Sequence, residues 1–148
     1  MQNVAWNWKK LTTDGEFLFP YSATQPISWL DLDDYAQAVA KCLTERGWAY
    51  GVYECVSTQS PLTRVELASI WSNVLKRKIV ATTMPLDEYM ALPHWAGRDL
   101  REMAILRTMF KEFDSHGAPG GNCRTMAMIL GRETTSYQNF AERYCLSK

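Results

Sequence analysis

Few segments of the chain have the pattern of a β-strand, and this scarcity limits the sheet that it can form. The residue types predict short strands over residues 16–20, 27–30 and 79–84, and residues 50–56 give the strongest strand prediction. About five helical patterns alternate with these segments. Three or four short strands are too few for a doubly wound sheet, which needs about six. The sequence therefore predicts an α+β fold, derived from the α/β class, with about five helices and about three or four short strands.

Signals at helix ends place the helices along the chain. The acidic run Asp31–Asp34 suits the start of a helix that Gly47 ends. Residues 63–66 and 135–138 both fit the capping box, S/T-x-x-E/Q. A long helix is expected over residues 98–113. Its spacing directs five side chains inward: Leu100, Met103, Leu106, Phe110 and Phe113.

Length and composition exclude several classes of protein. The 148 residues predict a single domain, residues 1–148. Because Lys plus Arg equal Asp plus Glu at 16 each, the basic excess of a nucleic-acid binder is absent. A hydrophobic content of 47% excludes intrinsic disorder. No apolar run reaches the roughly 18 residues of a membrane span, and no secretory signal pattern is present, so we expect a cytoplasmic protein.

The cysteines and histidines give no sign of a metal site. Cys42, Cys55, Cys123 and Cys145 lie far apart and form no C-x-x-C pair. We expect free thiols, as is usual in a reducing cytoplasm. With two histidines in the chain, a histidine-rich metal site is not expected either.

Catalytic motifs are also scarce. The chain contains neither G-x-G-x-x-G nor a P-loop nor a G-x-S-x-G elbow. Residues 117–121 are rich in glycine but follow a helix, which indicates a connector. Tyr144 and Lys148 have the Y-x-x-x-K spacing of dehydrogenases, but Lys148 is the last residue, where chains fray. We interpret Asp31, Asp33 and Asp34 as helix-capping groups. We therefore expect no catalytic residue.

The order of several short motifs resembles a known family. The most specific segment is Pro26–Ala36, and the others are Met1–Asn3, Gly51–Glu54, Leu62–Leu67, Leu130–Arg132 and Thr135–Phe140. Together they resemble the C-terminal half of the NmrA-like family, atypical short-chain dehydrogenase/reductase relatives that bind NAD(P). Asp34–Ala36 is similar to the family's D-[IV]-A. Asn3 is similar to the asparagine of its aromatic-x-E-N motif, with Gln2 in place of the acid.

The resemblance implies a substrate-lobe fold without the Rossmann half. In that family the first half holds the glycine-rich dinucleotide loop and most of the parallel sheet. We therefore expect no cofactor on this chain alone, and NADP only together with a nucleotide-binding half. Without that half, Tyr50–Val56 would present an open strand edge and apolar faces would be exposed. This predicts a homodimer or a separate Rossmann-type partner, joined by strand addition or aromatic packing.

Three functions remain open at this point. The first is a free-standing small-molecule-binding or regulatory module, without catalysis alone, for a small apolar or aromatic ligand. The second is the substrate-binding half of an NAD(P)-dependent oxidoreductase that another chain completes. The third is a protein-interaction domain without a ligand. Apolar walls with a few polar anchors are typical of pockets. The candidate lining residues are Asn3, Trp6, Asn7, Phe19, Trp29, Tyr89, His94, Trp95 and Met103.

Overall fold

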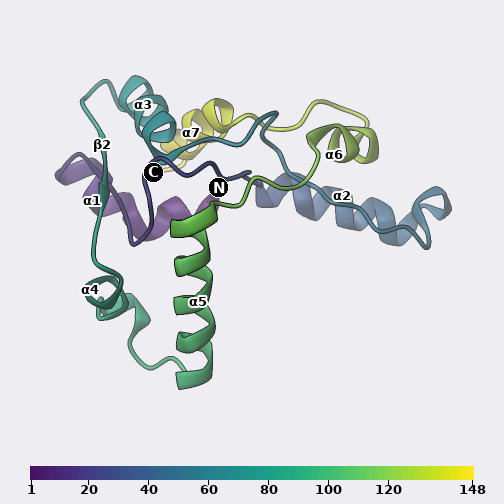
Figure 1. Cartoon of the computed structure of the whole chain (residues 1–148). Helices are drawn as coiled ribbons and strands as arrows, with labels where there is room; N and C mark the ends of the chain where they lie inside the picture. The colour runs from purple at the N-terminus through teal and green to yellow at the C-terminus, as the bar shows by residue number, and fades with distance from the viewer.

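Seven α-helices and two short parallel strands form the chain, and its computed structural model describes residues 1–148 (Figure 1). The structure is mostly helical, with more helices than expected, because residues 8–13 and 86–90 form short helices of their own. The elements are η1 (Gln2–Asn7), α1 (Trp8–Thr13), β1 (Glu16–Phe19), α2 (Leu32–Thr44), η2 (Arg46–Trp48), α3 (Arg64–Leu75), β2 (Val80–Thr83), α4 (Leu86–Met90), η3 (Pro93–Trp95), α5 (Leu100–His116), α6 (Cys123–Leu130) and α7 (Tyr137–Leu146).

The sheet consists of β1 and β2 alone. The two strands are parallel, in a register that places Glu16 opposite Val80 and Phe19 opposite Thr83. This confirms the strands expected over residues 16–20 and 79–84. β1 ends before Pro20, which has no N–H to donate to a ladder.

The other two strand predictions are wrong. Residues 27–30 form only isolated bridges, in which Ile27 lies opposite Leu62 and Ala118. In residues 50–56, Cys55 alone forms a bridge, to Asn122. A strand exists only where a neighbouring strand accepts its main-chain hydrogen bonds. The residue types in 50–56 favour a strand, but the chain supplies no such neighbour.

The helix ends follow local rules with two exceptions. Thr63 and Glu66 form the predicted capping box of α3. α2 ends at Thr44, before the predicted end at Gly47, and a separate 3-10 turn follows it. α7 is capped by Ser136, whose hydroxyl oxygen accepts from the Asn139 N–H at 3.1 Å, so the second capping-box prediction is wrong.

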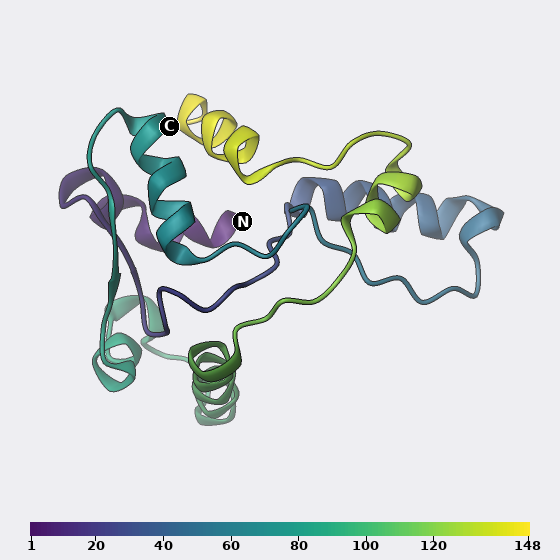
Figure 2. The same ribbon diagram turned by 45° about the horizontal axis from the view of Figure 1, so that its top comes forward.

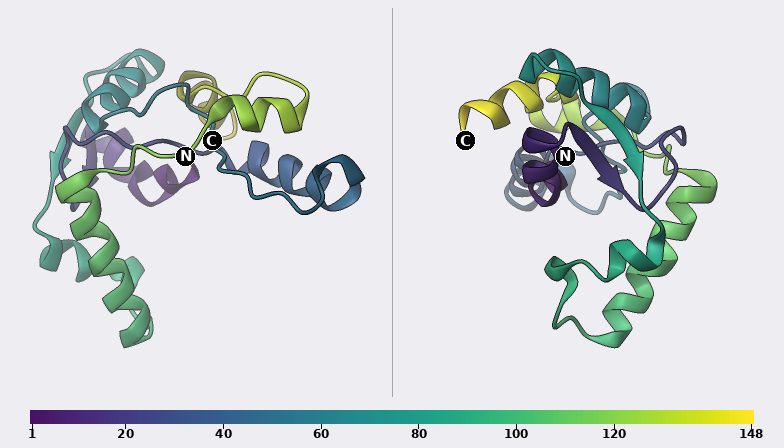
Figure 3. Two further views of the ribbon diagram at one scale, coloured as in Figure 1. Left: turned by 45° about the vertical axis from the view of Figure 1, so that its right-hand side comes forward. Right: turned by 90° about the vertical axis from the view of Figure 1, so that its left-hand side faces the viewer.

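Two hydrophobic cores of very different size hold the elements together. The main core contains 19 buried residues from η1, α1, β1, α3, α4, η3, α5, α7 and the segments next to them. A second core of four buried residues, Ala38, Met126, Ile129 and Leu130, joins α2 to α6. α2 and α6 therefore project from the main core as an arm, and α5 projects in another direction (Figures 1 and 3).

Not every side chain of α5 lies where the sequence places it. Phe110 is buried, and Met103, Leu106 and Phe113 pack against the main core. Leu100 is 86% exposed, so its predicted inward position is wrong. The reason is that the first turn of α5 lies beyond the main core (Figure 3). No helix in the structure has the length and apolar character that a bilayer span requires.

Candidate functional site

Four of the nine candidate lining residues lie together in one aromatic cluster. Trp6 comes from η1, Tyr89 from α4, and His94 and Trp95 from η3. Pro93 begins η3, and its fixed φ favours this tight turn, which carries both His94 and Trp95. We call these four residues, together with Arg98, the aromatic face.

The outer layer of the aromatic face is a stacked pair. The rings of Trp6 and His94 are nearly parallel at 16°, with centroids 6.2 Å apart, and both side chains are exposed. Trp95 meets Trp6 edge-on at 5.6 Å and lies 4.7 Å from His94. Ring pairs in such geometries attract beyond their simple burial. The aromatic face is therefore a solvent-exposed aromatic surface whose rings are held in place by packing on one another.

The inner layer contains two polar atoms without partners. Tyr89 and Trp95 are 1% and 2% exposed, and the Tyr89 hydroxyl and the Trp95 Nε1–H have no hydrogen-bond partner. The great majority of buried polar atoms in proteins are hydrogen-bonded, so each exception requires an explanation. The rings that carry these donors lie next to His94, with centroid separations of 5.7 Å for Tyr89 and 4.7 Å for Trp95.

The electrostatics of the aromatic face favour neutral rings with one cation at the edge. The Arg98 guanidinium lies 5.1 Å from the Trp95 ring centroid, in the range of a cation–π contact. Burial, and secondly the charge of Arg98, lower the pKa of His94 from 6.5, which keeps the imidazole neutral at pH 7. Burial raises the pKa of Tyr89 to about 12, so its hydroxyl remains a donor.

The other five candidate residues lie outside the aromatic face, and three of them have structural roles. Asn7 is buried, and its side-chain oxygen accepts from the Leu18 N–H at 3.1 Å. Phe19 lies in the main core, 6.5 Å from the Tyr89 ring. Trp29 packs on Tyr137 and donates to the Leu62 carbonyl at 3.2 Å.

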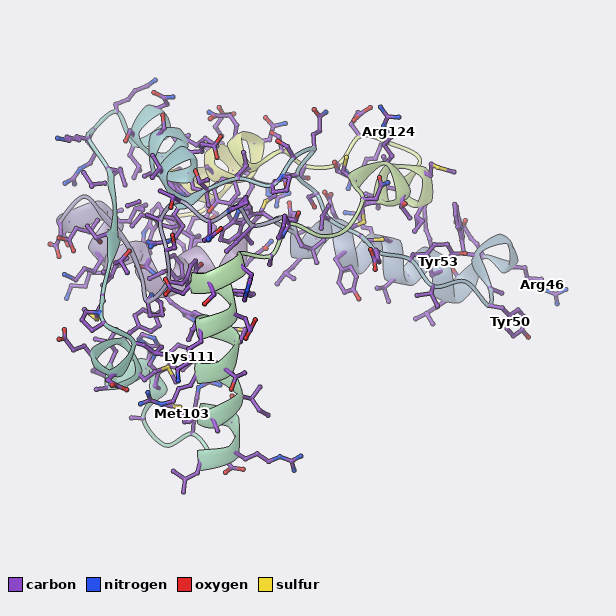
Figure 4. The ribbon with its side chains drawn as sticks, in the orientation of Figure 1. Arg46, Tyr50, Tyr53, Met103, Lys111 and Arg124 are labelled. Carbon is purple, nitrogen blue, oxygen red and sulfur yellow. The ribbon has the colours of Figure 1, made fainter.

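Asn3 and Met103 lie outside the aromatic cluster. Asn3 is exposed on η1. Met103 is half-buried, and Figure 4 shows it on the side of α5 that faces α4.

A buried carboxylate at the start of α2 is a feature that the sequence did not reveal. Asp34 is 1% exposed and accepts from Arg132 at 2.8 Å, from the Thr135 N–H at 2.7 Å and from the Thr135 hydroxyl at 3.0 Å. The expected capping role falls to Asp31, which accepts from the Asp33 N–H at 3.1 Å. The structure contains no cluster of three metal-ligating side chains.

A buried arginine is the second feature that the sequence did not reveal. Arg64 is fully buried and donates to the main-chain carbonyls of Phe17 and Thr82 at 3.2 and 2.7 Å, and also to that of Tyr21. It thereby fastens β1 and β2 to α3. A capping-box position is normally at the surface, so no local signal distinguishes Arg64 from an exposed arginine.

A separate polar pocket of about 250 Å³ lies between residues 57–62, α3 and the start of α7. Hydroxyl and amide side chains line most of it, with no charged group. It shares no residue with the aromatic face. The aromatic face has the more specific features, because it combines an exposed ring stack with buried donors that lack acceptors.

Comparison with known proteins places the fold. No protein-family model matches the chain, and no protein of curated function matches it in sequence. Among solved structures, it is similar to the NADPH-dependent quinone oxidoreductase of Escherichia coli, with a TM-score of 0.76, 19% identity, and coverage of 97% of this chain and 51% of that one.

Two further structures give the same result. A nucleoside-diphosphate-sugar epimerase of Staphylococcus aureus has a TM-score of 0.75 at 14% identity, covering 95% of this chain and 48% of that one. The triphenylmethane reductase of Citrobacter sp., in complex with NADP(H), has a TM-score of 0.72 at 22% identity, covering 93% and 47%. The chain thus spans about half the length of the structures that it matches. This confirms the partial NmrA-like fold that the sequence resemblance implied.

Proposed function

We propose that the chain is a ligand-binding lobe that holds a small planar aromatic compound on its aromatic face and does not catalyse a reaction by itself. The observation that carries this proposal is the exposed Trp6–His94 stack beside two buried donors, Tyr89 OH and Trp95 Nε1, that lack acceptors. Aromatic walls with a few fixed polar groups are the usual chemistry of small-molecule sites.

The chemistry of the aromatic face suits a flat ring that bears a carbonyl. Such a ring stacks on Trp6 or on neutral His94. Because the Tyr89 hydroxyl and the Trp95 Nε1–H are buried in the free chain, a carbonyl oxygen of the ligand accepts from either of them only after the outer rings move aside. Two of the similar structures are named for compounds built from six-membered unsaturated rings, a quinone and triphenylmethane. Quinones have both a flat ring and carbonyl oxygens, so they are the compound class that we favour.

A second function is the substrate-binding half of an NAD(P)-dependent oxidoreductase, completed by a nucleotide-binding domain. Two observations favour it. The chain spans about half the length of structures described as NADPH-dependent or as bound to NADP(H). Its parallel sheet has only two strands, whereas parallel sheets occur almost only as larger sheets covered on both faces.

Thermal unfolding with added ligands tests the first function. The probe is 2,3-dimethyl-1,4-naphthoquinone, whose blocked ring positions cannot add the four free thiols. Ligand at one hundred times its Kd stabilises the folded state by about 2.7 kcal/mol, which is readily measured as a rise in Tm. We expect this rise in the wild type and in Trp48→Ala, and its loss in Trp6→Ala. Trp48 is a matched control because its ring packs on Tyr53, in the arm.

The other outcomes distinguish the remaining functions. A rise in Tm with NADPH alone would show that this chain holds the cofactor, and would contradict a purely ligand-binding lobe. No rise with the quinone would contradict the first function, and the second function and an interaction domain without a ligand would then be the alternatives. A quinone-dependent rise that survives Trp6→Ala would place the site elsewhere.

A further inference from the structure

The polar pocket of about 250 Å³ is built from segments that are far apart in the chain. Three parts of the molecule line it: the loop of residues 57–62, Ile70 on α3, and residues 134–138 at the start of α7. Figure 2 shows α3 and α7 side by side, each preceded by a segment that comes from the arm. The pocket shares no residue with the aromatic face, so the ligand proposed above leaves it unused.

Hydrogen bonds hold the two walls of the pocket in place. The Thr134 hydroxyl donates to the Ser57 carbonyl at 2.7 Å. The Ser57 hydroxyl donates at 3.3 Å to Asp34, which also accepts from the Thr135 N–H. Ser57 and Thr58 are 1% and 5% exposed, so this wall belongs to the packed structure. A ligand therefore meets a pocket that is already formed, which reduces the entropic cost of binding.

Two hydroxyl groups of the pocket have no acceptor for their protons. The Thr58 hydroxyl accepts from the Trp29 N–H at 3.1 Å and donates to no atom of the chain. The Ser136 hydroxyl accepts from the Asn139 N–H, also at 3.1 Å, and likewise donates to none. Buried polar groups are normally satisfied, so the proton of the buried Thr58 hydroxyl requires an acceptor from outside the chain.

Two side-chain amides add an acceptor and further donors. The Gln138 amide nitrogen donates to Glu142 at 2.6 Å, and the Gln138 Oε1 atom remains free to accept. Gln59 is exposed at the rim, and its amide is free to donate and to accept. A carboxylate only accepts and an ammonium only donates, whereas a hydroxyl does both. The mixture of free groups in the pocket therefore matches a ligand with several hydroxyls.

The rest of the lining excludes charge and limits size. No charged side chain lines the pocket, so an ionised ligand group would lose its hydration without gaining an ion pair. Leu62, Ile70 and Tyr137 supply apolar surface on which C–H groups can pack. The volume of about 250 Å³ is below the range of roughly 300–1,000 Å³ that suits drug-sized compounds, which indicates a ligand with a single ring.

We propose that this pocket binds a neutral cyclic polyhydroxy compound of the size of a monosaccharide. Its hydroxyl groups accept from the Thr58 and Ser136 hydroxyls and donate to Gln138 Oε1, while its C–H face packs on Leu62 and Ile70. The site goes beyond the ligand-binding function of the aromatic face and does not depend on it.

NMR spectra of the backbone amides of the whole chain test this proposal. The probes are D-glucose, D-galactose, D-mannose and myo-inositol, each titrated to about 100 mM, which detects Kd values in the millimolar range. We expect at least one of them to shift the signals of Thr58, Gln59 and Gln138 saturably. The charged controls, D-glucose 6-phosphate and D-glucosamine, should bind more weakly than the best neutral compound.

Matched variants locate the site. Gln138→Ala should weaken binding by about threefold to tenfold, the effect of one lost hydrogen bond. Gln138 is half-buried and alanine favours a helix, so the variant should remain folded, which circular dichroism verifies. The control is Gln25→Ala, whose amide donates to the Ser115 carbonyl at 3.0 Å outside the pocket, and it should leave the affinity unchanged.

Three results would overturn the proposal. One is the absence of saturable shifts with all four neutral probes. Another is tighter binding of a charged control than of every neutral probe, which would make the pocket a site for ions. The third is binding that Gln138→Ala does not weaken, or that shifts only Trp6 and His94, which would place the compound elsewhere.

Discussion

The Asp34 carboxylate accepts a hydrogen bond from the Arg132 guanidinium at 2.8 Å, across a separation of 98 residues. Thr135 donates to the same carboxylate through both its N–H and its hydroxyl. Three of the motifs that carry the family resemblance, Asp34–Ala36, Leu130–Arg132 and Thr135–Phe140, therefore meet at one buried point. Their role here is to fasten the arm to the start of α7.

Removing the charge of Asp34 should destabilise the fold. Asp34→Asn keeps the shape but leaves buried donors facing an amide, and we expect a loss of about 2–4 kcal/mol in the free energy of unfolding. Urea unfolding measures it. The matched control is Asp33→Asn, at a side chain that is 65% exposed, where we expect less than about 1 kcal/mol. Equal losses in the two variants would contradict a structural role for Asp34.

The same carboxylate should make stability depend on acid pH. Burial alone would raise the pKa of Asp34, but the hydrogen bonds from Thr135 and the pair with Arg132 outweigh it and lower the pKa below 3.8. A lowered pKa in the folded state stabilises the fold above the unfolded pKa, and this contribution disappears as pH falls through the folded pKa. Urea unfolding from pH 6 to pH 3 should show a smaller acid loss in Asp34→Asn than in the wild type. A parallel decline in both would contradict the assignment.

How much of the fold the sequence predicts depends on whether a feature is local. The capping box of Thr63 and Glu66 involves neighbours in the chain, so the sequence predicts it correctly. Residues 50–56 have strand-forming residue types, but a strand also depends on a distant partner, which no local pattern reveals.

The same reasoning applies to the candidate site. The residue types indicated which aromatic side chains suit a ligand, and His94 was among the candidates. The sequence could not separate Trp6, which is exposed, from Trp29, which packs on Tyr137. Nor could it foresee the orphaned Tyr89 hydroxyl, because that depends on the packing of α4 against α5 and η3.

Arg64 should be irreplaceable by lysine. Its guanidinium donates to several carbonyls at once, and burial lowers its pKa. The single ammonium group of lysine lacks the planar set of N–H donors with which a guanidinium reaches several carbonyls at once. We expect Arg64→Lys to cost at least about 3 kcal/mol in urea unfolding, since it leaves buried carbonyls unpaired. Arg101→Lys, on the exposed side of α5, is the control and should change little. Near wild-type stability of Arg64→Lys would refute this account.

His94 should titrate below its ordinary pKa. Burial and the nearby Arg98 both lower the pKa of His94 from 6.5, so we expect an NMR titration midpoint under that value. Arg98→Gln should raise the midpoint part of the way back, while Arg101→Gln should leave it unchanged. Because the unfolded chain binds this proton more readily, His94 lowers stability as pH falls below 6.5. A midpoint at or above 6.5 would contradict the lowering of the His94 pKa by burial and by Arg98.

The most direct test of the ligand-binding lobe is the NMR spectrum of its six tryptophan indole N–H groups. We predict that 2,3-dimethyl-1,4-naphthoquinone shifts the signals of Trp6 and Trp95. The signal of Trp48, whose Nε1–H donates to the Glu45 carboxylate at 3.1 Å, should not shift. Saturable shifts of Trp6 and Trp95 would establish the aromatic face as a ligand site. Unchanged signals up to the solubility of the quinone, or shifts confined to Trp48, would contradict it.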